Sequence, residues 1–327
     1  MKIVIVGSGG RLGAALMREY RDKFEVTGFD HAQLDLSDKT ELRDKLQPID
    51  FDVLVNAAAF TNVDLCETER ERAFLINGEA PRILAKICRD KNAKLIHFST
   101  DYVFDGKKRE PYTEEDEATP ISVYGQSKKA GEENVLHVQS RHLIVRVSWV
   151  FGPDRSSFVD AMMKRARKEA EINAIADKFS TPTYTRDIAE VLPRFFPAAT
   201  TAGISDPGKN LRGTEFAANT PAVPEPAVGG RSESAGDFSG ILHFANTGEC
   251  SWQEYAQWAL DCCQRLGVQV KAKTVGQLKL KDMKNWIARR PAYSVLSTAK
   301  YTALTGVSPR AWREAVADYI KRFYSKK

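Results

Sequence analysis

The stretch that determines the fold is residues 2–13, KIVIVGSGGRLG, where a short apolar run leads directly into a glycine-rich turn. The apolar run predicts a buried strand, and Arg11–Phe24 carries helix formers at helical spacing. Gly7, Gly10 and Gly13 allow the backbone to turn tightly and to approach a pyrophosphate at the helix N-terminus. This G-x-x-G-x-x-G spacing between a strand and a helix favours dinucleotide binding over a plain tight turn.

Short apolar runs recur along the first 150 residues without polar alternation, as expected for strands buried on both faces of a parallel sheet. The predicted strands are Lys2–Val6, Glu25–Phe29, Asp52–Asn56, Lys94–Ser99 and Leu143–Val147. The predicted helical segments between them are Arg11–Phe24, Lys39–Gln47, Glu69–Asp90 and Ser127–Val138. This alternation predicts a Rossmann-like, doubly wound α/β domain that binds NAD(P) over residues 1–150.

The pattern after Phe151 is less regular and predicts a smaller C-terminal substrate-binding cap over residues 151–327. Helices are expected at 157–170, 251–266 and 309–323, and strands at 172–175 and 241–244. Segments 172–190 and 240–246 are expected to return to the first domain. Residues 198–238 are rich in Ala, Gly, Pro, Ser and Thr, and we interpret them as a flexible or loosely packed insertion. A surface excursion is favoured there over a lid.

The composition indicates an ordinary globular protein. The 327 residues are 43% hydrophobic and 28% charged, which excludes collagen-like, wholly disordered and disulfide-scaffold proteins. No apolar run reaches the roughly 18–20 residues needed to cross a bilayer, and the first residues do not have a signal-peptide layout. Five cysteines without metal-ligand spacing indicate reduced thiols and no metal site, in a cytoplasmic protein.

Charge is distributed unevenly along the chain. The total is +5, but the part from Gln264 onward has nine Lys and six Arg against two Asp and one Glu, which leaves the remainder acidic. The basic quarter could bind an anionic ligand such as a diphosphate, form a solvated surface, or dock on the acidic remainder. No nucleic-acid-binding module is visible, so nucleic acid is not an expected partner. A membrane is not expected either, because no apolar run is long enough to cross one.

Several residues beyond the glycines are candidates for cofactor binding. Asp30 ends the second strand, where a carboxylate can bind an adenosine ribose and repel a 2′-phosphate. This position favours NADH, although Asp30 would also suit a turn and Arg11 in the phosphate loop keeps NADPH open. Asp35 and Leu36 are expected to border the adenine. The remaining candidates are Leu12 in the loop and the small residues Asn56, Ala57, Ala58 and Ala59, which also suit plain close packing.

The catalytic candidates are Thr100, at the end of the fourth strand, and the pair Tyr124 and Lys128. Residues four apart share one face of a helix, and an ammonium near a phenol favours phenolate, which lowers the phenol's pKa from about 10. That would give a proton donor and acceptor usable near neutral pH. Thr100 would hold a carbonyl or hydroxyl oxygen beside Tyr124. A surface Tyr/Lys pair is the alternative, which the ordered set of motifs disfavours.

These motifs resemble an extended short-chain dehydrogenase/reductase, and more closely the dTDP-4-dehydrorhamnose reductase family. The resemblance covers nearly the whole chain except 198–238. It is carried by the glycine turn and by residues 56–64 (NAAAFTNVD), 98–106 (FSTDYVFDG), 124–132 (YGQSKKAGE), 146–152 (RVSWVFG) and 181–183 (TPT) with Asp187, and it continues through 240–243 (GILH), 251–252 (SW) and 290–291 (RP).

The resemblance implies hydride transfer from NADPH or NADH to the C4 ketone of a nucleotide-linked 6-deoxy sugar, by a monomer or homodimer. Tyr124 would protonate the developing alkoxide, Lys128 would bind the nicotinamide ribose, and Thr100 would hydrogen-bond the sugar C4 oxygen. The expected substrate contacts are Thr61, Val63, Asp101, Tyr102, Trp149 and Arg289. Core packing is the alternative for Trp149 and Val63.

Three positions depart from the family pattern on the substrate side. Ser157 and Tyr293 stand where the family usually has Asn, and Ser180 stands where it usually has Gly. A nucleotide-sugar epimerase or 4,6-dehydratase is an alternative on the same scaffold. However, dehydratases usually supply an extra acid as Asp-Glu after the threonine, whereas Asp101 is followed by Tyr102. A non-catalytic alternative is a cofactor-binding regulatory subunit resembling that of methionine adenosyltransferase.

Overall fold

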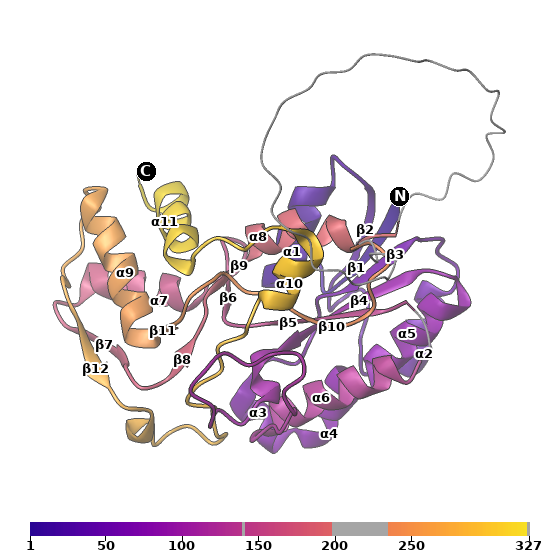
Figure 1. The fold of residues 1–327 in the computed structure, drawn as a ribbon, viewed down its shortest axis with the longest axis horizontal. Helices are drawn as coiled ribbons and strands as arrows, with labels where there is room; N and C mark the ends of the chain where they lie inside the picture. Colours follow the sequence, from indigo (N-terminus) through magenta and orange to yellow (C-terminus); the bar gives the residue numbers. More distant parts are fainter. Residues whose placement is uncertain (139–140, 198–234, 326–327) are drawn as a thin grey trace, which may run out of the picture.

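Six parallel strands form the central sheet of the computed structural model, which describes residues 1–138, 141–197 and 235–325. Their spatial order is β10-β5-β4-β3-β1-β2 (Figure 1). The strands are β1 Lys2–Val6, β2 Glu25–Phe29, β3 Val53–Asn56, β4 Lys94–Thr100, β5 Leu143–Val147 and β10 Gly240–His243. The first five match the predicted strands to within one residue. Strand order reverses beside β1, and ligands bind at such a switch point, outside the carboxyl ends of the strands.

Helices cover both faces of this sheet, which confirms the doubly wound α/β fold. One face packs against α1 (Arg11–Tyr20), α8 (Thr185–Val191) and α10 (Ala299–Thr305). The other face packs against α2 (Lys39–Leu46), α5 (Ala80–Asp90) and α6 (Val123–Leu136). Figure 1 shows the two groups of helices on opposite sides of the strands.

Three predicted helices differ from the observed ones. Helix α1 ends at Tyr20, four residues before the predicted end at Phe24. Helix α6 begins four residues earlier than expected because Ser122 caps it, accepting a hydrogen bond from the Gly125 N–H at 3.2 Å. The segment predicted as one helix over Glu69–Asp90 comprises α4 (Arg70–Phe74), a π-helical turn at Leu75–Glu79 and α5. In that turn the Asn77 side chain bonds both backbone groups of Phe60, which ties the turn to the loop after β3. The short α3 (Val63–Thr68) lies between that loop and α4.

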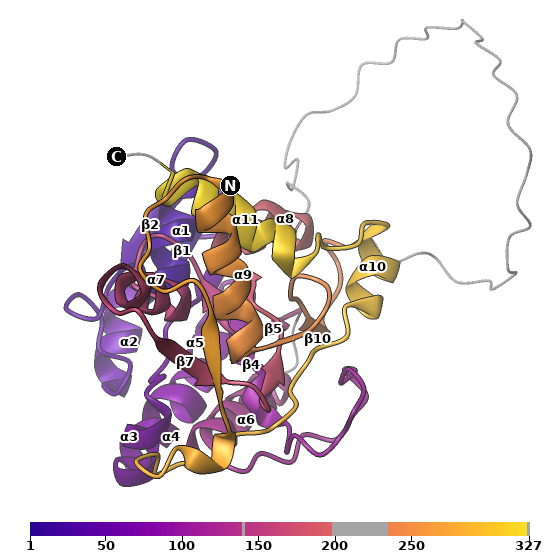
Figure 2. The same ribbon diagram turned by 90° about the vertical axis from the view of Figure 1, so that its left-hand side faces the viewer.

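A second lobe is built around the helices α7 (Phe158–Lys168), α9 (Trp252–Arg265) and α11 (Trp312–Phe323), which face the viewer in Figure 2. Strand β7 (Ile172–Ile175) pairs with β12 (Val275–Leu278) in this lobe. Short pairs β6/β9 (Val150–Phe151 with Thr183–Tyr184) and β8/β11 (Phe179–Ser180 with Cys250–Ser251) complete it. The segment 172–190 is therefore divided: its strand packs in the second lobe, whereas α8 packs on the sheet.

The end of the predicted insertion 198–238 is well packed, which corrects its C-terminal bound. Residues 198–234 lie outside the described residues. In the remaining four, Phe238 is buried against the sheet, and the Lys94 ammonium donates to the carbonyls of Gly236 and Phe238 at 2.7 and 2.9 Å. These contacts fix the chain directly before β10.

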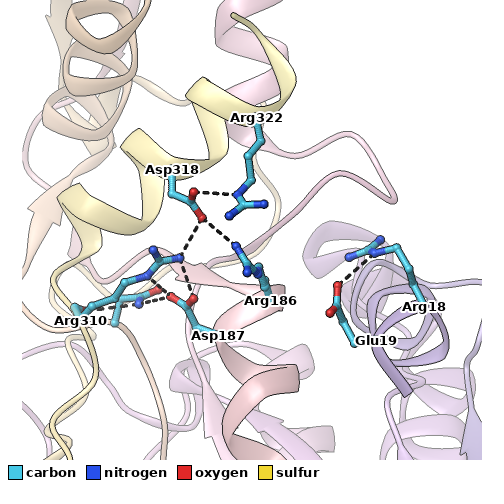
Figure 3. Close-up of polar contacts among 8 residues, drawn as sticks. Arg18, Glu19, Arg186, Asp187, Arg310, Asp318 and Arg322 are labelled. Carbon is cyan, nitrogen blue, oxygen red and sulfur yellow. Dashed lines mark hydrogen bonds and ion pairs between the residues drawn. The ribbon is translucent and has the colours of Figure 1, made fainter. Parts of the chain in front are cut away.

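Part of the basic C-terminal region docks on acidic residues elsewhere in the chain. Arg310 binds the Asp187 carboxylate of α8 with two hydrogen bonds, at 2.8 and 2.7 Å, and also pairs with Asp318 of α11 (Figure 3). Arg290 likewise binds the Asp64 carboxylate of α3 with two hydrogen bonds. These pairs support the docking interpretation for two of the basic residues. No helix in the described part of the chain is long and apolar enough to span a membrane.

Candidate active site

The glycine turn brings β1, α1 and the loop after β3 into very close contact. Gly7 has a φ of +84°, and a Cβ there would lie 2.7 Å from the Ala58 nitrogen. A Cβ on Gly13 would lie 2.1 Å from the Gly7 carbonyl oxygen, so α1 could not approach the turn with a larger residue. Helix α1 starts directly after Gly10, and no side chain caps its N-terminus. Its first N–H groups are therefore available to an anion, as a diphosphate requires.

A cavity of about 860 Å³ runs from this turn along the carboxyl ends of β1 to β5. The sequence-predicted residues that line it are Gly7, Gly10, Arg11, Leu12, Asp30, Asp35, Leu36, Ala57, Ala58, Ala59, Thr61, Thr100, Tyr124, Lys128 and Trp149. The predicted residues outside its lining are Gly13, Asn56, Val63, Asp101, Tyr102 and Arg289. The structure thus brings the glycine turn and the three catalytic candidates to one cavity, large enough for a dinucleotide.

The carboxylate of Asp30 serves the turn after β2 and also lines the cavity. One oxygen accepts hydrogen bonds from the N–H groups of Ala32 and Gln33, both at 3.0 Å. Asp35 lies further along the same wall, where hydrogen bonds from the Ser37 N–H and hydroxyl lower the pKa of its carboxyl group. Asp30 therefore acts as a turn residue, and its place in the cavity lining is compatible with the predicted binding of a ribose.

Arg11 points towards the second lobe. Its guanidinium donates to the carbonyls of Val150 at 3.2 Å and Ser156 at 2.6 Å. In return, the Arg155 side chain donates to the Gly9 carbonyl at 2.8 Å and lines the cavity. These reciprocal bonds fasten the loop after β6 across the glycine turn. Sequence reasoning missed Arg155, because nothing local indicates that a loop 146 residues away reaches Gly9.

The catalytic candidates meet because α6 packs tightly against the turn that follows β4. A Cβ on Gly125 would lie 2.2 Å from the Tyr102 carbonyl oxygen, and the rings of Tyr102 and Tyr124 meet edge to face at 5.7 Å. The Thr100 hydroxyl donates to the Asp101 carboxylate at 3.1 Å and accepts from the Tyr102 N–H at 3.2 Å. A side-chain hydrogen bond with Thr100 also acts to lower the pKa of the Tyr124 phenol.

The pKa of Tyr124 differs from the sequence-based prediction. Burial raises it well above its usual range, and this outweighs the opposing effect of the Thr100 hydrogen bond. Lys128 is not among the groups that act on the pKa of Tyr124. Its Nζ instead donates to the Phe98 carbonyl at 2.7 Å and lies 3.3 Å from His97 Nε2. Burial also lowers the pKa of Lys128 to about 8. Tyr124 is therefore a protonated phenol at neutral pH, suited to donating a proton.

The predicted substrate residues divide into two groups. Thr61 and Trp149 line the cavity, and Trp149 stacks on Trp252 of the second lobe at 5.2 Å. Asp101 instead lies beneath the site, where its carboxylate accepts hydrogen bonds from Ser294 at 2.6 Å and Ser180 at 3.2 Å. Of the others, Val63 begins α3, Tyr102 follows Asp101 in the turn, and Arg289 precedes the Arg290 that binds Asp64.

The three departures from the family pattern have identifiable packing roles. Ser157 precedes α7, and its N–H and hydroxyl both donate to Asp160, at 2.7 and 2.6 Å. Ser180 holds Asp101. The Tyr293 hydroxyl donates to Glu249 at 2.6 Å, and its backbone bridges to Phe179, the neighbour of Ser180.

Comparison with known proteins identifies similar chains over almost the full length. The family model described as the RmlD substrate binding domain matches residues 1–204 and 225–325. The spore coat polysaccharide biosynthesis protein SpsK of Bacillus subtilis is 32% identical, covering 98% of this chain and 97% of its own. The dTDP-4-dehydrorhamnose reductase of Mycolicibacterium smegmatis is 34% identical, and the match covers 98% of this chain and 85% of that relative. Among solved structures, dTDP-4-dehydrorhamnose reductase from Bacillus anthracis in complex with NADP superposes with a TM-score of 0.81. Its sequence is 26% identical, and the match covers 98% of this chain and 99% of that chain.

Proposed function

The chain belongs to the RmlD substrate-binding family, and from this we propose that it is an NAD(P)H-dependent reductase of dTDP-4-dehydrorhamnose, forming dTDP-L-rhamnose. The observation that carries the proposal is the single cavity lined by the glycine turn and by Thr100, Tyr124 and Lys128. A dinucleotide cradle and a proton donor are the two parts that a carbonyl reduction needs, and here they face the same space.

The residue roles that we propose are those that the family resemblance implies, and the shared cavity is compatible with them. When bound, the nicotinamide supplies a hydride, which adds to the C4 carbonyl carbon of the sugar and leaves negative charge on its oxygen. The Thr100 hydroxyl would turn from the Asp101 carboxylate, to which it donates in the structure, and donate its proton to that oxygen. Tyr124 would then give the oxygen its phenolic proton, so that the carbonyl becomes an alcohol. The cradle of Gly7, Gly10 and the α1 N-terminus holds the diphosphate, while Lys128 binds the adjacent ribose.

The test is a cofactor-oxidation assay with purified protein. NADH and NADPH are each offered with dTDP-4-dehydrorhamnose, and a UDP-linked 4-ketosugar is run in parallel. Loss of nicotinamide absorbance with the dTDP sugar, accompanied by formation of dTDP-L-rhamnose, supports the proposal. Absence of turnover with both sugars and both cofactors contradicts it.

The epimerase, dehydratase and regulatory-subunit alternatives predict different behaviour. An epimerase retains NAD through purification, so the pure protein would carry nicotinamide absorbance, whereas a reductase must exchange its cofactor. A dehydratase needs a second acid after Thr100, and Asp101 is instead enclosed by Ser180 and Ser294. A regulatory subunit would co-purify with a catalytic partner and show no turnover.

The substrate class also bears on location and assembly. From this substrate class we expect the protein to work in the cytoplasm, as a monomer or homodimer. Fractionation of cells and light scattering of the purified protein measure these two properties directly.

A further inference from the structure

Three polar side chains form a buried chain beneath the candidate active site. Asn56 ends β3, His97 lies opposite it on β4 as its register partner, and Lys128 reaches them from α6. All three are at most 1% exposed. The Asn56 amide nitrogen lies 3.0 Å from His97 Nδ1, and His97 Nε2 lies 3.3 Å from the Lys128 ammonium nitrogen. Only Lys128 among them lines the cavity.

The hydrogen bonds fix which nitrogen of His97 carries the proton. The Asn56 side-chain oxygen accepts from the Ala58 N–H at 3.2 Å, so its NH₂ group must face the imidazole. Nδ1 therefore accepts a hydrogen bond, and a neutral ring then holds its proton on Nε2. Burial keeps the ring neutral, because it lowers the pKa of His97 well below the usual value.

This tautomer directs an N–H group at Lys128. A neutral amine can accept that hydrogen bond while donating to the Phe98 carbonyl at 2.7 Å, but an ammonium cannot accept it. Moving the His97 proton to Nδ1 would require the Asn56 amide to turn over, which would break its bond to Ala58. Each way of charging Lys128 therefore sacrifices a buried hydrogen bond.

We propose that His97, held in one tautomer by Asn56, is a positioning residue that sets the protonation state of Lys128 and thereby the pH range of the reductase. This inference rests on the proposed function. Each reduction consumes one proton, which Tyr124 delivers and must regain. A lysine poised between amine and ammonium, one helical turn away at the same cavity, is suited to returning it.

The other titratable groups near Lys128 do not replace this control. Glu132 lies one turn further along α6, but Arg146 of β5 binds both of its oxygens, at 2.9 and 2.7 Å. Many other titratable groups lie on α6 and on the elements that pack against it. They are Tyr124, Lys129 and Glu133 on α6, Asp101 and Tyr102 after β4, Lys94 on β4, Asp64, Cys66 and Glu67 on α3, Arg70, Glu71 and Arg72 on α4, Glu79 in the π-helical turn, and Arg82, Lys86, Cys88, Arg89 and Asp90 on α5. Of these, Arg72 and Tyr124 share the cavity lining with Lys128, and Glu79 is paired with Arg82. His97 is the residue whose hydrogen bond to Lys128 depends on the lysine's charge.

Two substitutions of His97 distinguish its hydrogen bond with Asn56 from its hydrogen bond with Lys128. In His97→Asn, the shorter amide keeps an acceptor for Asn56 but no longer reaches Lys128. In His97→Gln, the longer amide reaches Lys128 with an N–H donor. Because the ammonium is the form that returns the proton, activity should fall as the pH rises through its pKa. The alkaline limb of kcat should move upward by about one pH unit in His97→Asn, and His97→Gln should restore it.

The outcomes distinguish this inference from the proposed function. An unchanged alkaline limb in His97→Asn, or an equal shift in both variants, would overturn the control by His97. Nitrogen chemical shifts of His97 in the wild-type protein provide a readout without substrate: an Nε2–H tautomer is expected, and an Nδ1–H tautomer would refute the argument. If wild-type protein reduces no ketosugar, the proposed function fails, and the tautomer measurement still decides the hydrogen-bond chain.

Discussion

Replacing Tyr124 by Phe removes one oxygen atom and leaves the ring in place. The edge-to-face contact with Tyr102 at 5.7 Å is preserved, so packing changes little. The phenol's hydrogen bond is worth about 1 kcal/mol net, which bounds the expected loss of folding stability. Loss of a general acid costs roughly 10²–10⁴-fold in rate, or about 3–5 kcal/mol of barrier. The effect on turnover should therefore exceed the effect on stability several-fold.

The assay is the rate of NADPH oxidation with dTDP-4-dehydrorhamnose, measured together with NADPH affinity and thermal unfolding. Tyr124→Phe should bind NADPH as the wild type does and turn over at least a hundred-fold more slowly. Tyr20→Phe is the matched control, because its buried hydroxyl donates to the Ala189 carbonyl at 2.9 Å beneath the sheet. It should lose a comparable amount of stability and retain kcat. Turnover by Tyr124→Phe within ten-fold of the wild type would refute Tyr124 as proton donor.

Three further predictions concern the cradle and the contacts that hold the C-terminal region. Gly13→Ala places a Cβ 2.1 Å from the Gly7 carbonyl oxygen, and a strain of about 1–3 kcal/mol should weaken NADPH binding about ten-fold or more in a fluorescence titration. Arg290 lowers the pKa of Asp64 to about 2, so this pair stabilises the fold above about pH 4 and loses its effect as the pH falls towards 2. Arg290→Met should flatten that acid dependence in urea unfolding. Asp187→Asn should lower the unfolding free energy by about 1.5–3 kcal/mol and leave kcat unchanged.

Each of these has a clear contrary result. Gly78→Ala is the control for the cradle, because the nearest atom to its Cβ lies at an ordinary 3.6 Å, and equal NADPH binding by both alanine variants would contradict the steric argument. An acid unfolding profile that Arg290→Met does not alter would mean that Asp64 contributes nothing to the pH dependence. A fall in kcat without loss of stability in Asp187→Asn would place that residue in the site.

The parts of the site that sequence predicted are those encoded locally. The glycine turn combines an apolar run, three spaced glycines and a helix start within 12 residues, so pattern alone specified it. The same is true of Thr100 at a strand end and of the Tyr124/Lys128 spacing, although the early start of α6 was missed despite Ser122. That cap is visible in the sequence, as a serine shortly after a proline and just before the helical pattern.

The parts that could not be predicted depend on which residues the fold brings side by side. Asn56 and His97 become neighbours only through the register of β3 with β4, and Arg155 reaches Gly9 only once the second lobe is in place. The Tyr124 pKa was predicted in the wrong direction because spacing on a helix says nothing of burial. The structure shows that desolvation dominates and that Lys128 bonds elsewhere.

Ser180 departs from the family pattern on the substrate side, and its hydrogen bond connects it to the catalytic candidate Thr100 through Asp101. A glycine, which the family usually has there, would leave Asp101 with one hydroxyl donor fewer, whereas Ser180 and Ser294 here both donate to the same carboxylate oxygen. The other oxygen accepts from Thr100, so the carboxylate links the departure to the residue expected to hold the reacting oxygen. Burial raises the pKa of Asp101, and each added donor favours its charged form. Ser180 therefore bears on how firmly Thr100 is oriented, and its effect should appear in turnover before it appears in the choice of sugar.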